Sequence, residues 1–274
     1  MRHFSIITNE TKDSGLTTTH LIKDYLTARG ATAQVCPGEH LHAEMIDTAS
    51  ECIIVLGGDG TLLRAARATS SLTIPLMGVN LGTLGYLASV EAAKVTPALD
   101  QLLENRFTRE ERMMLSGKKT DGESNYALND IAIVRYGSLQ MIDFHIYVNG
   151  QMLNTYHADG VVISTPTGST GYNLSAGGPI VEPRAELILV TPICPHTLNT
   201  RTIILSAQDR ITIELAGTRH GEEEQAEASF DGSDRIVMQV GDRIEIHKSK
   251  RTTQLLKLND DTFLEVLRKK MSAN

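Results

Sequence analysis

Apolar residues in the first hundred positions alternate between short unbroken runs and longer stretches with helical spacing. Within residues 16–29 they recur along one helix face, and Gly30 stands where a helix end is expected. A second helical segment, Leu62–Ala68, is rich in Ala and Arg, which favour helix. The expected strands are Phe4–Ile7, Cys52–Leu56 and Ile74–Val79. This alternation predicts an α/β, Rossmann-like domain around a parallel sheet, which we assign to residues 1–108.

From about residue 110 the pattern changes to β-branched and alternating runs separated by turn residues, which predicts a β-rich, sandwich-like domain over residues 109–259. Asn149–Gly150 is the strongest hairpin signal, because both positions tolerate positive φ. We expect the polar, acidic stretch Thr218–Gln225 to be an exposed loop. The expected strands are Tyr126–Arg135, Ile142–Val148, Gln151–Tyr156, Val161–Ser164, Leu187–Val190, Ile203–Leu205, Ile211–Leu215, Arg235–Val240 and Arg243–His247.

The last residues, 260–274, have the pattern of a helix over Asp261–Met271 with basic residues in its final turn. Asp260 or Asp261 is the expected cap. We expect this helix to pack back on the N-terminal domain.

Composition narrows the class of protein. The formal net charge of −7 argues against a broad nucleic-acid surface, which needs clustered Lys and Arg facing phosphates. The three cysteines, Cys36, Cys52 and Cys194, lack paired spacing and indicate a reducing compartment. No run of about 18 apolar residues is present to cross a membrane, and the N-terminus reads as a strand, not an export signal. We expect a cytoplasmic protein without nucleic-acid or membrane partners.

A glycine-rich turn, Gly57–Thr61, joins a buried strand to a helix. Such a turn directs unpaired backbone N–H groups and the positive helix end at one point, which suits a phosphate. No lysine follows the glycines, so backbone, hydroxyls or metal must hold that phosphate. Asp59 would repel phosphate unless it binds Mg²⁺ or accepts the proton of an attacking hydroxyl. The alternative is that Asp59 only caps a helix that begins near Thr61.

Hydroxyls and glycines dominate a second cluster, from Asp159 to Pro179. Pro166 keeps the preceding residue extended, so we expect successive hydroxyls and N–H groups to be exposed. Tyr172 offers a flat face on which a purine or nicotinamide could stack. The alternative is an ordinary serine-rich loop.

An amide beside a carboxylate, Asn129–Asp130, begins the apolar strand Ile131–Val134. The pair could hold two adjacent ribose hydroxyls, one as donor and one as acceptor. A simple turn-forming pair is the alternative.

Five segments, taken together and in this order, resemble the NAD kinase family. The first alone is not specific, because lipid kinases of the diacylglycerol type and phosphofructokinases carry a similar turn. The segments are Gly57–Thr61, Asn80–Leu87, Leu128–Asp130, Asp159–Pro179 and Thr191–His196.

This resemblance implies the NAD kinase/diacylglycerol kinase-like fold and transfer of the γ-phosphoryl of ATP, with Mg²⁺ or another divalent metal, to the adenosine ribose 2′-hydroxyl of NAD. It also implies a homodimer or homotetramer. Asp59 would be the catalytic carboxylate, through metal or as a base. The residues expected to bind the nucleotides are Gly57, Gly58, Gly60, Thr61, Asn129, Asp130, Asp159, Thr167, Thr170, Gly171, Tyr172 and Ser175.

Three positions depart from the family pattern. Asp130 stands where glutamate is common, Gly171 where alanine is usual, and Tyr86 where phenylalanine is common. The shorter Asp130 reaches about one methylene less far toward ribose. Two other functions stay open: a lipid kinase, which should carry a membrane-seeking surface, and a sensor that binds NAD(H) or NADP(H) without catalysis.

Overall fold

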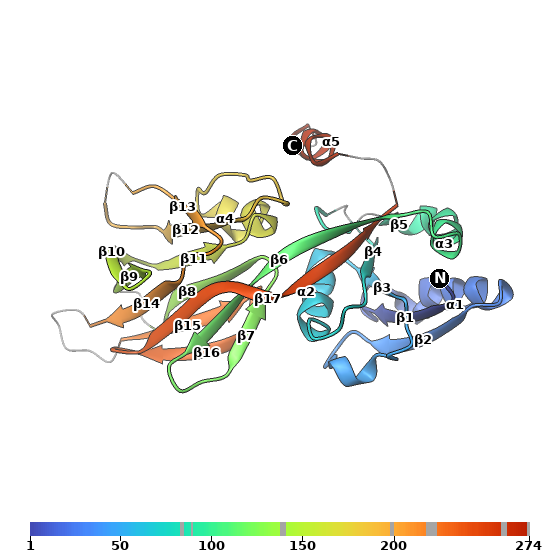
Figure 1. Cartoon of the computed structure of the whole chain (residues 1–274), viewed down its shortest axis with the longest axis horizontal. Coiled ribbons are helices and arrows are strands. Elements are labelled where there is room, and N and C mark those ends of the chain that lie inside the picture. Colours follow the sequence, from blue (N-terminus) through green and yellow to red (C-terminus); the bar gives the residue numbers. More distant parts are fainter. Residues whose placement is uncertain are drawn as a thin grey trace. The chain divides into compact units, whose positions relative to one another are not determined.

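The computed structural model (Figure 1) describes residues 1–82, 85–88, 90–137, 141–197, 200–217, 224–258 and 262–272. The chain forms two compact units, one of Met1–Arg112 with Thr252–Asn274 and one of Met113–Arg251. Strands β6 (Thr108–Lys119) and β17 (Arg243–Lys257) each continue from one unit into the other.

The first unit is built on a parallel sheet with the strand order β2-β1-β3-β4. Short β5 and the end of β17 both pair with β4. The strands are β1 (His3–Thr8), β2 (Thr32–Pro37), β3 (Cys52–Gly57), β4 (Leu76–Asn80) and β5 (Val90–Glu91). The parallel α/β arrangement predicted for this region is confirmed.

Helices cover both faces of this sheet (Figure 1). Ile54 and Leu56 of β3 point into a core shared with α1 and α3. The opposite face carries α2, because an added Cβ at Gly78 of β4 would lie 3.3 Å from a methyl carbon of Leu62. The helices are α1 (Thr17–Ala28), α2 (Asp59–Ala68) and α3 (Val95–Leu103), with short 3-10 turns η1 (Ser14–Leu16), η2 (Ala43–Met45) and η3 (Ala92–Lys94).

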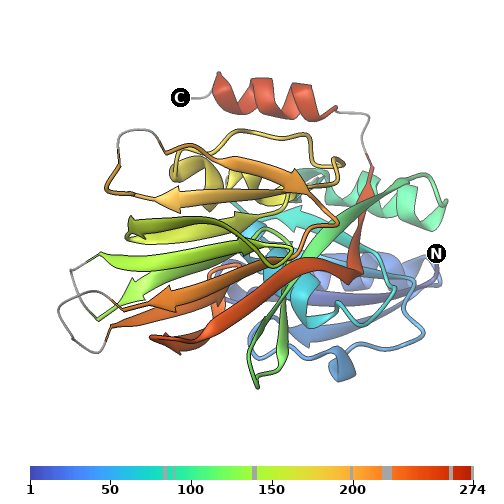
Figure 2. The same cartoon turned by 60° about the vertical axis from the view of Figure 1, so that its left-hand side comes forward.

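The second unit consists of two antiparallel layers, as Figure 2 shows. One is a six-stranded sheet with the order β13-β12-β11-β8-β15-β16. The other contains β10-β9-β14-β17, together with β6 and β7. The strands are β7 (Ser124–Ala127), β8 (Asp130–Tyr136), β9 (Ile142–Val148), β10 (Gln151–Ala158), β11 (Gly160–Ser164), β12 (Leu187–Ile193), β13 (Ile203–Ser206), β14 (Ile211–Ala216), β15 (Gln225–Phe230) and β16 (Ser233–Gln239). The β-rich, sandwich-like prediction is confirmed.

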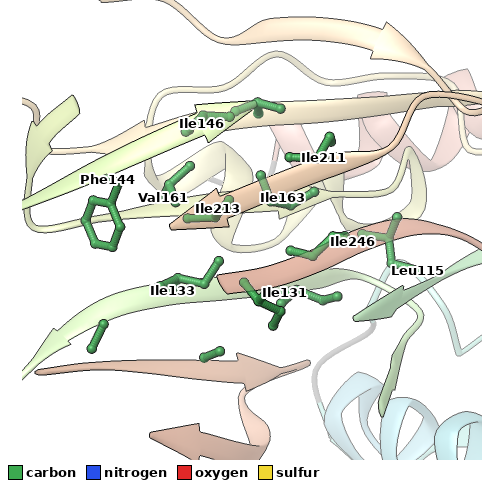
Figure 3. Close-up of a cluster of buried hydrophobic side chains, with 14 of the residues drawn as sticks. Leu115, Ile131, Ile133, Phe144, Ile146, Val161, Ile163, Ile211, Ile213 and Ile246 are labelled. Atoms are coloured by element: carbon green, nitrogen blue, oxygen red, sulfur yellow. The ribbon is translucent and has the colours of Figure 1, made fainter. Parts of the chain in front are cut away.

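Alternating side chains of both layers fill the space between them (Figure 3). Ile131 and Ile163 come from the six-stranded sheet, and Phe144 and Ile213 come from the facing layer; all four are buried completely. The core therefore rests on β-branched residues and phenylalanine, in agreement with a sequence that has no tryptophan.

The expected hairpin forms at Asn149–Gly150, where φ is 51° and 80°. The last predicted strand is longer than expected: Arg243–His247 continues to Lys257 as β17. Residues 248–254 are polar and give no apolar signal, and β17 pairs with β4 near its end, at Leu255. This strand is extended by its partners and not by local preference.

The C-terminal helix α5 (Phe263–Met271) begins two residues later than predicted, and its cap is Thr262. The Thr262 hydroxyl accepts the Glu265 amide, while the Glu265 carboxylate accepts the Thr262 amide at 2.7 Å. This reciprocal box displaces the expected aspartate cap. Lys270 of α5 lies over the Tyr86 ring, 5.4 Å from its centroid.

None of the described helices is long and apolar enough to cross a bilayer. Cys36 and Cys52 are buried free thiols, and Cys194 is an exposed one.

Ile163→Ala should lower the free energy of unfolding by about 2–5 kcal/mol, because it removes transfer energy and leaves a cavity in the sandwich core. Ile163→Val should cost about 0.5–1.5 kcal/mol. Urea denaturation measures both. The control is Ile204→Ala at the sheet edge, where the side chain is half exposed and the change should stay within about 0.5 kcal/mol. Equal losses at both positions would contradict the proposed core.

Candidate functional site

The expected site residues form two clusters, one in each unit. In the first, Gly57 ends β3 and α2 begins at Asp59, so the glycine turn is very tight. A Cβ at Gly57 would lie 2.3 Å from the Thr61 hydroxyl oxygen, which explains the glycine. Asn9, directly after β1, donates its side-chain amide to that hydroxyl at 3.2 Å. The carboxyl ends of β1 and β3 are thereby tied together at this turn.

The N-terminus of α2 presents its first-turn amides, of which that of Thr61 already donates to the Gly58 carbonyl at 2.9 Å. A cation lies against the same turn, because an added Cβ at Gly58 would be 3.1 Å from Lys12 Nζ. Lys12 comes from the loop after β1, where its backbone N–H donates to the Asn9 carbonyl. Amides, helix dipole and ammonium together suit a phosphate group. No lysine follows the glycines in the sequence. Lys12 precedes them by some 45 positions and lies in the loop after a different strand, β1.

Asp59 does not cap α2, so the capping alternative is wrong. It is the first residue of the helix, Gly58 is the N-cap, and α2 has no side-chain cap hydrogen bond. The Asp59 carboxylate instead accepts the backbone N–H groups of Tyr86, Leu87 and Ala88, at 2.7, 3.2 and 3.2 Å. A half-buried acidic group is thus held at the phosphate-binding end of the helix.

In the second unit, the segment Leu128–Asp130 is held from two sides. The Asp231 carboxylate accepts all three of its backbone N–H groups, at 2.9, 2.8 and 3.1 Å. On the carbonyl side, Thr165 donates its hydroxyl to Leu128 and its amide to Asn129. Asp130 then enters β8, as predicted for a strand start. The sequence analysis did not single out Asp231, which lies a hundred residues away.

The hydroxyl-rich segment does not expose its hydroxyls as expected. Ser164, Thr165 and Ser169 have no solvent exposure. Their hydroxyls bond the backbone of their own unit: Ser164 donates to Thr165, and Ser169 donates to Val181. A tight irregular turn leaves backbone groups unpaired, and short hydroxyl side chains satisfy them locally.

Buried Asn173 anchors the second half of that segment. Its amide nitrogen donates to the carbonyls of Ser169 and Pro179, and its oxygen accepts the Thr191 hydroxyl. This fixes η4 (Thr167–Thr170) and the single turn α4 (Tyr172–Ser175). Tyr172 and Ser175 are exposed on that turn, while Thr170 and Gly171 are half-buried.

Among the described residues, two buried polar atoms of this cluster have no hydrogen-bond partner: Asn129 Oδ1 and Thr167 Oγ1. Buried polar atoms are normally paired; the amide oxygen can accept a hydrogen bond, and the hydroxyl can donate or accept one. An added Cβ at Gly171 would lie 3.4 Å from Asn129 Nδ2, which places that turn beside the same side chain.

Charged groups surround Tyr172. Burial first, and then the negative charges of Cys194, Asp130 and Asp159, raise the pKa of its phenol. Asp159 is itself paired with Arg135, whose Nε lies 2.7 Å from its carboxylate. The second cluster therefore combines an exposed aromatic ring, a paired acid, a buried acid and unpaired amide and hydroxyl oxygens, which suits a nucleoside.

The described residues contain no group of three or more His, Cys, Asp or Glu side chains that could hold a metal ion.

Residues 18–107 match the family of ATP-NAD kinase N-terminal domains, and residues 128–258 match the family of ATP-NAD kinase C-terminal domains. The chain belongs to the ATP-NAD kinase family. It is 47% identical to NAD kinase of Agathobacter rectalis, over 99% of both chains. It is 43% identical to NAD kinase of Lachnoclostridium phytofermentans, over 98% of this chain and 99% of that one.

Two solved structures share its fold. Yeast NADH kinase complexed with NADH has a TM-score of 0.86 at 24% identity, covering all of this chain and 88% of that one. An NAD kinase from Archaeoglobus fulgidus in complex with ATP has a TM-score of 0.81 at 24% identity, covering 99% of both. The predicted fold class of this ATP-NAD kinase family member is thus confirmed.

One carboxyl of the second cluster titrates far from its usual range. Burial of Asp130, followed by the charge of Asp231, raises its pKa from 3.8 to about 7. Between these values the folded chain holds a proton that the unfolded chain has released, so this group lowers stability as pH rises.

Asp130→Asn should remove that dependence, because the amide does not ionise. We expect the free energy of unfolding of the variant, relative to the parent chain, to rise between pH 5 and pH 8. Urea denaturation at both pH values tests this. A constant difference across the range would show that Asp130 does not carry the shift.

Proposed function

We propose that this chain transfers the γ-phosphoryl group of ATP to the 2′-hydroxyl of the adenosine ribose of NAD, giving NADP and ADP. Phosphorylation of NAD is the activity of the family to which the chain belongs. The observation that carries the residue-level proposal is the carboxylate of Asp59, held by three amides at the phosphate-binding end of α2.

The step forms a bond between the ribose oxygen and the γ-phosphorus and breaks the bond from that phosphorus to the β–γ bridging oxygen. The ribose proton passes to Asp59, and ADP leaves. Most of the acceleration in such transfers comes from positioning and charge neutralisation. A general base adds typically 10²- to 10⁴-fold.

Phosphates are assigned to the first cluster. Gly57, Gly58, Gly60 and Thr61 shape the turn and offer amides, and Lys12 adds a positive charge beside Gly58. A divalent cation such as Mg²⁺ would enter with the phosphates of ATP, and the Asp59 carboxylate would be its ligand from this cluster.

NAD is assigned to the second cluster. Asn129 and Asp130 would hold ribose hydroxyls, with the unpaired Asn129 Oδ1 as one acceptor. Asp159, Thr167, Thr170, Gly171, Tyr172 and Ser175 would surround the nucleoside bases. Tyr172 supports this assignment because its exposed ring is a stacking surface beside buried polar atoms.

We also propose a homodimer or homotetramer that works in the cytoplasm. Support for the compartment comes from three cysteines that are all free thiols. A non-catalytic sensor of NAD(H) or NADP(H) is the remaining alternative, and turnover separates the two.

Purified protein with NAD, ATP and Mg²⁺ should form NADP, read by an NADP-specific dehydrogenase. Asp59→Asn should lower kcat by about 10²- to 10⁴-fold, because the amide cannot accept the ribose proton. NAD binding, measured by calorimetry, should persist in the variant. Nearly full activity of Asp59→Asn would remove Asp59 from the mechanism, and binding without turnover by the parent chain would favour the sensor.

Lys12→Gln should raise KM for ATP and lower kcat/KM about 10- to 100-fold, as expected for losing a charged hydrogen bond to phosphate. The KM for NAD should change little. Lys23→Gln, on the exposed surface of α1, is the matched control. Unchanged ATP kinetics in Lys12→Gln would exclude this lysine from the phosphate site.

A further inference from the structure

The segment Gly85–Ala88 follows β4 and lies against the start of α2. Three of its consecutive amides, from Tyr86 to Ala88, donate to one carboxylate, that of Asp59. Consecutive N–H groups that converge on one anion are rare outside caps and anion-binding turns. Here the anion is supplied by the chain itself.

Gly85 makes this approach feasible. A Cβ at position 85 would lie 2.0, 2.2 and 2.3 Å from Oδ1, Cγ and Oδ2 of Asp59. Contacts this short do not occur, so any side chain at position 85 must displace the carboxylate. The three nearest atoms all belong to the end of one side chain, so the carboxylate is the first group that a Cβ would displace.

The three bonds leave a defined opening on the carboxylate. Among the described residues, Oδ1 accepts the amides of Leu87 and Ala88, and Oδ2 accepts that of Tyr86. A carboxylate has about four acceptor sites, two on each oxygen. One site on Oδ2 is therefore left to accept a hydroxyl.

We propose that Gly85–Ala88 is a positioning element for the catalytic carboxylate: its amides orient Asp59 so that Oδ2 receives the ribose hydroxyl, and Gly85 is the residue that lets them do so. This inference rests on the proposed function and deepens it. Gly85 acts through Asp59 and is not itself catalytic.

A merely structural role for the segment makes a different prediction. If the three bonds only tie β4 to α2, breaking them should reduce stability and leave kcat per folded molecule unchanged. If they orient Asp59, breaking them should reduce kcat with little change in KM for either nucleotide.

The first test is Gly85→Ala. We expect kcat to fall on the order of 10²-fold, as for a misplaced catalytic group, with KM for ATP and NAD within about threefold. The matched control is Gly82→Ala, shortly before the segment, where no atom of the described residues lies within 4 Å of an added Cβ; it should retain the parent kcat. Parent-like kcat in Gly85→Ala would overturn the proposal.

The second test is a double-mutant cycle with Asp59→Ala, which removes the atoms that the new Cβ would strike. Residues that act as one unit are strongly non-additive. Gly85→Ala should therefore change the residual rate of Asp59→Ala by less than about twofold. An equal loss in both backgrounds would show that Gly85 does not act through Asp59.

Thermal unfolding of the same variants tests whether the new Cβ meets Asp59, whereas kcat tests whether that contact orients the carboxylate. The midpoint should fall in the parent background and stay constant in the Asp59→Ala background. Absence of NADP formation by the parent chain would reject the proposed function itself, whereas an active parent with an equally active Gly85→Ala would reject only the positioning element.

Discussion

An aspartate carboxylate that accepts three consecutive backbone amides is the interaction on which both clusters depend. Asp59 binds residues 86–88 in the first unit, and Asp231 binds residues 128–130 in the second. Each triplet belongs to a segment whose amides would otherwise lack partners. Because buried or half-buried N–H groups must be satisfied, a distant carboxylate fixes the shape of each segment where no helix or sheet could.

The two carboxylates differ in their consequences. Asp231 holds the backbone of its segment, and burial of Asp130, followed by the charge of Asp231, raises the pKa of Asp130 to about 7. The same interaction that holds the proposed ribose-binding segment therefore places a protonatable acid within it. Asp59 combines both functions in one side chain: it secures its own segment and keeps one acceptor site on Oδ2. At both clusters, therefore, the hydrogen bonds of a carboxylate hold the backbone and also set the electrostatic environment of the proposed site.

Local signals located most of the fold and the segments of the site. The buried run at Cys52, the turn at Asn149–Gly150 and the glycine turn around Asp59 are all encoded by neighbouring residues. The partners were not predictable in this way. Lys12 and Asp231 act through contacts with distant parts of the chain, which a linear pattern does not contain. Thr262 is a helix cap whose signal competes with that of the neighbouring aspartates. The sequence predicts exposed hydroxyls at Ser164, Thr165 and Ser169, because composition cannot show that a turn uses them internally.

The glycines of these segments have different physical reasons. A Cβ added at Gly57 would strike Thr61. A Cβ added at Gly168 would lie 2.2 Å from the Asn129 carbonyl oxygen, and one at Gly178 would lie 2.1 Å from Asn173 Oδ1. Internal packing explains each of them without a ligand. Within the described residues, no atom lies within 4 Å of an added Cβ at Gly60, and its φ lies outside the left-handed region. Neither packing nor conformation within the described residues requires a glycine there, which separates Gly60 from the three glycines whose neighbours leave no room for a Cβ.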